Sequence, residues 1–66
     1  METKITDEEL ETLRLRYIED LDQQTAADKM GLSQSQYQRD ISTVLEKITR
    51  ALIEGNAISI SKKKPE

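Results

Sequence analysis

The segment from residue 25 to residue 39 most constrains how this chain can fold, because it predicts two short helices that cross at close range. It consists of Thr-Ala-Ala-Asp-Lys-Met-Gly-Leu-Ser-Gln-Ser-Gln-Tyr-Gln-Arg. The small Ala27 lets two backbones approach, and Gly31 supplies the positive φ that ends a helix. Tyr37 then fills the angle between the helices. This spacing indicates a helix-turn-helix, whose second helix can enter the major groove of DNA.

The composition limits the chain to one small domain. Sixty-six residues bury only about 60% of the unfolded surface, so stability is marginal. The chain has no cysteine and no histidine, which excludes disulfides, thiolate metal sites and an imidazole base. No apolar run approaches the ~20 residues of a membrane span, and the first residues lack the layout of a signal peptide. We therefore expect a cytoplasmic protein with no cofactor, no metal and no membrane contact.

The net charge of −3 argues against a strongly basic surface, but the charges are unevenly distributed. Residues 1–32 contain nine acidic and four basic residues, a balance of −5. Residues 33–66 contain four acidic and six basic residues, a balance of +2. The positive charge therefore lies in the half that contains the predicted recognition helix. The overall acidity predicts weak non-specific binding to DNA, because that part of the affinity comes from neutralised phosphates.

The first helix is predicted over residues 7–19. Thr6 and Glu9 have the spacing of a capping box, which opens a helix. One face of this helix is apolar at helical spacing and comprises Leu10, Leu13, Tyr17 and Leu21, with Ile18 at its edge. Leu15 lies off this face, either as part of a wide buried surface or as a dimer contact.

Two more helices follow. Asp22 is the predicted N-cap of a helix over 23–30, and residues 31–33 form the turn. Ser33 then caps a long third helix, with Gln36 at the reciprocal position of a second capping box. The apolar register of that helix continues to Glu54, and Gly55 is a stop signal.

The end of the chain is harder to assign. Residues 57–61 alternate apolar and polar side chains, as in a short strand. A three-helix domain offers no partner strand. This segment is therefore either an extended tail or a strand that pairs with the same segment of a second copy in a dimer. Residues 62–66 are predicted to be a disordered basic tail, either solvated or grasping DNA. The predicted fold is all-α: a three-helix domain over 1–61, with a helix-turn-helix core at 22–42 and a long third helix.

From Glu9 to Ile60 the chain resembles a family of short uncharacterised prokaryotic proteins predicted to bind DNA. Their helix-turn-helix is similar to region four of sigma factors. The resemblance is carried by residues 11–15 (Glu-Thr-Leu-Arg-Leu), by residues 24–33 (Gln-Thr-Ala-Ala-Asp-Lys-Met-Gly-Leu-Ser) after Leu21, and by residues 51–60. It implies a DNA-binding domain of a transcriptional regulator. The chain departs from the family at Gln34, where arginine is usual, and at Asp40, where an apolar residue is usual; we expect Asp40 to pair with Arg14 or Arg16.

The predicted interface divides into base contacts and phosphate contacts. The base-reading set on the third helix is Gln34, Ser35, Gln38 and Arg39. The phosphate set is Gln23, Gln24, Lys29, Ser33, Ser42 and Thr43. Glutamine can bind adenine through N6 and N7, and arginine can bind guanine through O6 and N7. The alternatives are an ordinary polar helix surface, a solvated Lys29 and a surface ion pair at Arg39.

These features predict sequence-specific binding of duplex DNA by a small transcriptional regulator, with the helix over 34–54 entering the major groove through its N-terminal turns. One such unit makes few base contacts, so we expect a homodimer on a two-fold operator. The candidate dimer surface is Leu15, Ile53, Ile58 and Ile60.

The alternative function is a protein-interaction module of the transcription machinery with the same fold, which would bind RNA polymerase or another regulator. The acidic first helix predicted for this chain fits such a protein-binding function. An enzyme is not expected. The acidic residues crowd one exposed helix start, and no nucleophile elbow, phosphate loop or metal-ligand spacing occurs.

Overall fold

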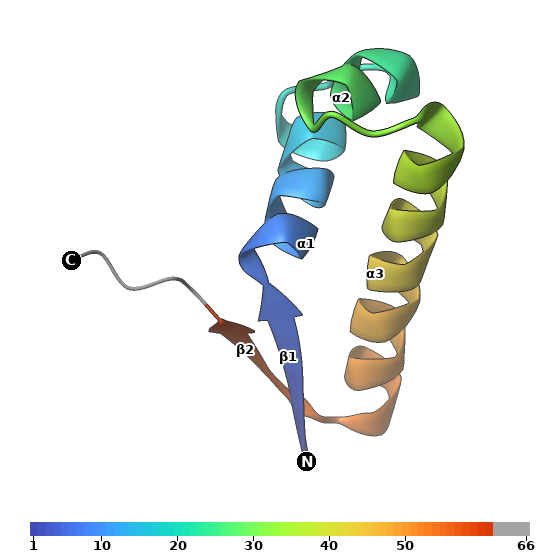
Figure 1. Cartoon of the computed structure of the whole chain (residues 1–66). Helices are drawn as coiled ribbons and strands as arrows, with labels where there is room; N and C mark the ends of the chain where they lie inside the picture. The colour runs from blue at the N-terminus through green and yellow to red at the C-terminus, as the bar shows by residue number, and fades with distance from the viewer. Residues whose placement is uncertain (62–66) are drawn as a thin grey trace, which may run out of the picture.

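The computed structural model describes residues 1–61 of the chain. Its elements follow the order β1 (Glu2–Thr6), α1 (Asp7–Leu13), η1 (Arg14–Ile18), α2 (Gln23–Lys29), α3 (Gln34–Glu54) and β2 (Ala57–Ser61). The segment η1 is a π-helix that continues α1. Figure 1 shows α2 at one end of the molecule, α3 running back beside α1, and the two strands at the other end. The predicted tail at 62–66 lies outside the described residues.

The two strands pair in parallel, from Glu2 opposite Ala57 to Thr6 opposite Ser61. The all-α prediction is therefore wrong: the domain is mostly helical but contains a two-stranded parallel sheet. Parallel strands need a long crossover, which the helices provide because α3 returns the chain to its N-terminal end (Figure 1). The partner of β2 is thus neither solvent nor a second copy but the first residues of the same chain. Ile5 anchors β1 and is only 1% exposed.

The core lies where α2 crosses α3 and η1. The cluster at this crossing consists of Leu15, Ala26, Ala27, Tyr37 and Ile41, all buried, and the core continues along the chain through buried Ile5, Val44 and Ala51. The alanines bring no bulk beyond Cβ, so the backbones can pack closely, as predicted. Tyr37 is fully buried, and its hydroxyl donates to the carbonyl oxygen of Thr12 at 2.6 Å.

The predicted buried face of the first helix is wrong in part. Thr12 and Leu15 are buried at 3% exposure, whereas Tyr17 and Ile18 are 55% and 77% exposed. Thr12 tolerates burial because its hydroxyl donates to the carbonyl of Glu8 at 2.8 Å. Beyond Leu13 the π-helical bonding pattern widens the turn and rotates later residues away from their α-helical positions. Since Leu15 belongs to the core, it is not a dimer contact.

The predicted helix starts are confirmed. Thr6 and Glu9 form the capping box, with reciprocal bonds of 3.2 and 2.9 Å. The Asp22 carboxylate accepts from the N–H of Thr25, and the Ser33 hydroxyl accepts from the N–H of Gln36. Helix initiation in this chain therefore follows local side-chain chemistry.

Two predicted side-chain pairings around α3 are wrong. The Gln36 amide does not close a second capping box but donates to Asp40 at 2.8 Å. Asp40 is therefore paired within its own helix rather than with an arginine of the first helix. Arg14 instead contacts Glu11 and Glu19, and the guanidinium of Arg16 donates to the carbonyl of Leu21 at 2.7 Å.

Candidate nucleic-acid interface

A tight turn joins α2 to α3. The N–H of Gly31 donates to the carbonyl of Asp28 at 3.1 Å, and the N–H of Leu32 donates to that of Ala27 at 2.9 Å. Gly31 has φ of 69°, as predicted. Ser33 caps α3 directly after this turn. The start of α3 is therefore held in a fixed orientation against α2 by backbone bonds and by buried Tyr37.

The predicted base-reading residues share one exposed side of α3. Gln34, Ser35, Gln38 and Arg39 are all exposed, and Ser42 and Thr43 extend the same side by a turn. At 3.6 residues per turn, this side lies away from Tyr37 and Ile41, which face the core. The structure thus brings together the base-reading set and two of the phosphate set. Ser33 is at the same helix start, but its hydroxyl is engaged in the cap.

The predicted phosphate contacts on α2 differ in availability. Lys29 is exposed, and no carboxylate partner is found for it within residues 1–61. The Gln24 amide donates to Asp28 at 3.1 Å and faces along its own helix. The start of α2 also carries the Asp22 carboxylate, whose pKa is held below its ordinary value by the N–H of Thr25. The carboxylates of Asp22 and Asp28 make α2 less attractive to phosphate than Lys29 alone suggests; the sequence analysis assigned Asp22 to the cap and did not weigh its charge.

One contact links the two helix starts. The side-chain amide of Gln34 lies 3.5 Å from the side-chain oxygen of Gln23, a long hydrogen bond. A predicted base-reading residue and a predicted phosphate contact are therefore neighbours at one edge of the α2–α3 unit. Their spacing of eleven residues in the sequence does not reveal this contact.

Of the cations on α2 and α3, Lys29 and Arg39 have no carboxylate partner within residues 1–61. Lys47 pairs with Glu9, Arg14 with Glu11 and Glu19, and Arg50 with Glu46. The guanidinium of Arg39, by contrast, has no side-chain hydrogen bond or ion pair within residues 1–61. The predicted surface ion pair at Arg39 is thus not formed in the structure, and its guanidinium is exposed beside Gln38.

The candidate dimer residues fall into two groups. Ile53, Ile58 and Ile60 are 80%, 41% and 48% exposed, whereas Leu15 is buried. Sequence reasoning missed the exposure of Tyr17 and Ile18, because it assumed a regular α-helix where the chain forms η1. The exposed side chains of Tyr17 and Ile18 line an apolar groove between α1, η1 and α3.

These features define a small, mostly helical domain with a parallel strand pair and a polar face at the start of its longest helix. The chain belongs to the family described as "Protein of unknown function DUF134", whose model matches residues 1–64. No helix within residues 1–61 has the length and apolarity needed to cross a membrane.

The relatives of this chain are longer proteins. A UPF0251 protein of Methanosarcina mazei is 46% identical over 59 residues, which cover 89% of this chain and 36% of that protein. A UPF0251 protein of Clostridium botulinum strain Okra is 48% identical over 54 residues, or 82% of this chain and 34% of that protein. The chain therefore spans about a third of the length of the curated relatives it matches. No solved structure matches the chain.

Proposed function

We propose that this domain binds duplex DNA in a sequence-specific manner, as a small transcriptional regulator in the cytoplasm. In this proposal residues 22–42 act as a helix-turn-helix similar to region four of sigma factors. The observation that carries it is the face of Gln34, Ser35, Gln38 and Arg39, which is exposed at the start of α3 directly after a rigid turn. A helix start held in this way can be inserted into the major groove without reorganising the domain.

The side chains on this face match the hydrogen-bonding edges of base pairs. Arg39 can donate two hydrogen bonds to O6 and N7 of guanine, and Gln38 can bind N6 and N7 of adenine. Because the Arg39 side chain has no ion-pair partner within the described residues, its insertion into the groove would break no ion pair at that position. The cost of reaching a base is thus limited to side-chain ordering and desolvation.

Gln34 and Gln23 serve the same interface in different ways. Gln34 lies at the first position of α3, where a side chain reaches the groove, and Gln23 lies at the first position of α2. Their 3.5 Å contact lets Gln23 hold Gln34 while its own amide faces a phosphate. Lys29 adds the charge that phosphate binding requires.

A binding titration with a matched control tests this function. The full chain is titrated with mixed-sequence duplexes at low and moderate salt, by amide-resolved NMR and by fluorescence anisotropy. We expect shifts at residues 23, 29 and 33–43 that fade with salt. The Arg39→Ala variant should lose most of the affinity. Lys4→Ala removes one charge from β1, the strand at the opposite end of the molecule from α2 (Figure 1), and should change the affinity little. If the wild-type protein shows no amide shifts at these positions even at low salt, the proposal is overturned.

Acidic side chains favour one second candidate, a module that binds RNA polymerase or another regulator. Asp22 caps the start of α2, and Asp28 lies in its last turn. The whole chain carries a net charge of −3. A basic protein surface would be attracted by these carboxylates, whereas phosphate would be repelled. Under this function Arg39→Ala leaves partner binding intact, while Asp28→Asn weakens it.

A further inference from the structure

Two glutamine side chains meet where α2 and α3 begin. Gln23 is the first residue of α2, and Gln34 is the first residue of α3. The Nε2 atom of Gln34 donates to the Oε1 atom of Gln23 across 3.5 Å. Gln23 is half-buried, whereas Gln34 is exposed. The inner amide therefore lies where it can support the outer one.

The bond to Gln23 determines what the amide of Gln34 can still offer to a ligand. A glutamine amide carries two N–H donors and one oxygen that accepts. One N–H of Gln34 is directed to Gln23, and this requires that the nitrogen and not the oxygen of Gln34 lies on that side. The outer edge of Gln34 is left with one N–H donor beside one acceptor oxygen.

Among the bases, adenine alone complements this edge with two hydrogen bonds. Adenine presents the N6 amino donor beside the N7 acceptor in the major groove. Guanine presents two acceptors, O6 and N7, so the amide oxygen would face O6 and repel it. Cytosine offers a single donor, and thymine offers a single acceptor beside its methyl group.

We propose that Gln34 reads an adenine at the base pair that faces the start of α3, and that Gln23 is the positioning residue that disfavours guanine there. The inference rests on the proposed function, because it requires that α3 enters the major groove. The N-terminal residues of a recognition helix are the ones that contact base edges, and Gln34 begins α3.

The bond between the two glutamines is long in the free domain, where water competes with it. Insertion into the groove displaces that water, and a hydrogen bond becomes stronger in the less polar surroundings. Because Gln34 already lies against Gln23, its side chain also has less freedom to lose when it meets a base. Both effects favour the orientation that fits adenine.

Gln38 provides a comparison within the same helix. It is exposed on the same side of α3, four residues after Gln34. Four residues correspond to about 6 Å along a helix, so the two side chains meet different base pairs. Within residues 1–61 no side-chain hydrogen bond orients the Gln38 amide. We therefore expect a stricter choice of base at Gln34 than at Gln38.

Selection from duplexes with a randomised central segment tests the inference, with the full chain at low salt. We expect the wild-type protein to require adenine at one base pair, a preference that Gln34→Ala loses and Gln38→Ala keeps. Guanine in place of that adenine should weaken wild-type binding about tenfold or more. 7-Deazaadenine lacks the N7 acceptor and should also weaken wild-type binding. Neither replacement should matter to Gln34→Ala.

Variants of Gln23 test its positioning role through the ratio of affinities for the adenine and guanine duplexes. Gln23→Met keeps the length of the side chain but removes the acceptor, so the ratio should fall about threefold or more. Gln23→Glu offers only acceptors and should preserve the ratio, although its charge lowers both affinities. Gln24→Met is the matched control for the ratio, because the Gln24 amide donates to Asp28 and not to Gln34. Circular dichroism establishes that the variants are folded.

Two results overturn the inference while the proposed function stands. One is a set of selected duplexes in which no adenine depends on Gln34, and the other is an adenine preference that Gln23→Met leaves unchanged. A wild-type protein that selects no duplex and gives no salt-sensitive amide shifts overturns the proposed function, and this inference with it.

Discussion

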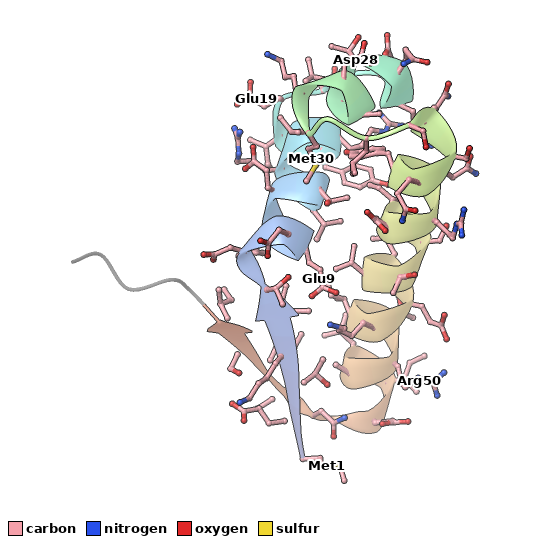
Figure 2. The ribbon with its side chains drawn as sticks, in the orientation of Figure 1. Met1, Glu9, Glu19, Asp28, Met30 and Arg50 are labelled. Atoms are coloured by element: carbon pink, nitrogen blue, oxygen red, sulfur yellow. The ribbon has the colours of Figure 1, made fainter. Side chains whose placement is uncertain are left out.

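The ammonium of Lys47 lies 2.9 Å from both carboxylate oxygens of Glu9 and 3.0 Å from the carbonyl oxygen of Lys4. Figure 2 shows Glu9 between α1 and α3. One side chain of α3 thus contacts the first turn of α1 and the backbone of β1. Glu9 also closes the capping box with Thr6, so this cluster fixes the junction at which the strand becomes a helix.

The Glu9 cluster predicts a loss of stability in acid. Burial alone raises the pKa of Glu9, but the N–H of Thr6 and the ammonium of Lys47 outweigh it, and the pKa lies below the ordinary value of 4.5. A depressed pKa in the folded state stabilises the fold above the unfolded pKa, and this contribution disappears as the pH falls through the folded value. We expect the free energy of unfolding to decrease as the pH drops below about 4.5.

The Glu9→Gln variant isolates this contribution. It should lose up to about 1 kcal/mol at neutral pH, the scale of a partly exposed ion pair, because the glutamine oxygen can still accept from the Thr6 N–H in the capping box. It should also show a shallower decline in acid. Urea unfolding at several pH values measures both effects. Glu11→Gln is the control, because Glu11 has a lowered pKa through its bond to Arg14, while within residues 1–61 its side chain forms no hydrogen bond or ion pair with β1 or α3. Equal losses at neutral pH in the two variants would contradict a special role for Glu9.

The buried hydroxyl of Tyr37 is predicted to stabilise the fold through its 2.6 Å hydrogen bond to the carbonyl of Thr12. Tyr37→Phe removes the donor and leaves that carbonyl without its partner, at a cost of about 1–3 kcal/mol. Tyr17→Phe makes the same chemical change on a half-exposed ring and should be nearly neutral. Thermal unfolding of both variants compares the two sites, and a neutral Tyr37→Phe would show that water replaces the lost donor.

The helices could be predicted from the sequence because their ends are set by residues that lie close to one another in the chain. Thr6, Asp22 and Ser33 cap through residues three positions ahead, and Gly31 and Gly55 end helices by their own backbone freedom. Each signal lies within one turn of chain. The starts of all three helices and the ends of α2 and α3 follow from these signals nearly to the residue, whereas the single helix predicted over 7–19 is divided into α1 and the π-helix η1.

The sheet and the apolar surface depend on residues far apart. β1 pairs with β2 across more than fifty positions, so the pairing follows from the return of α3 and not from any local pattern. Tyr17 and Ile18 become exposed because η1 is a π-helix. The prediction of a buried apolar face assumed α-helical spacing throughout residues 7–19. The exposed side of α3 was predicted correctly, since its polar residues alternate with Tyr37 and Ile41 at regular spacing. Its binding to DNA stays a prediction.

The turn between α2 and α3 is predicted to require a residue that accepts positive φ. Gly31 has φ of 69°, and a Cβ built there would meet no atom within 4 Å. The cost of Gly31→Ala is therefore conformational, about 1–2 kcal/mol, with no steric clash. Gly31→Asn should cost less, because asparagine tolerates this region better. Chemical denaturation of the two variants gives the order, and a larger loss for asparagine than for alanine would refute the backbone explanation.

Gln34 is predicted to limit the affinity for DNA. Its position at the start of α3 is exposed, and an arginine there would add one phosphate or guanine contact. Gln34→Arg should strengthen binding and steepen the dependence of log K on log salt by about one unit, because one more counterion is released. Ala57→Arg adds the same charge in β2, at the opposite end of the molecule (Figure 1), and should change the slope little. Anisotropy titrations at several salt concentrations measure both slopes. If the two variants gain affinity equally, the effect is one of net charge, and the start of α3 is not the surface that meets the DNA.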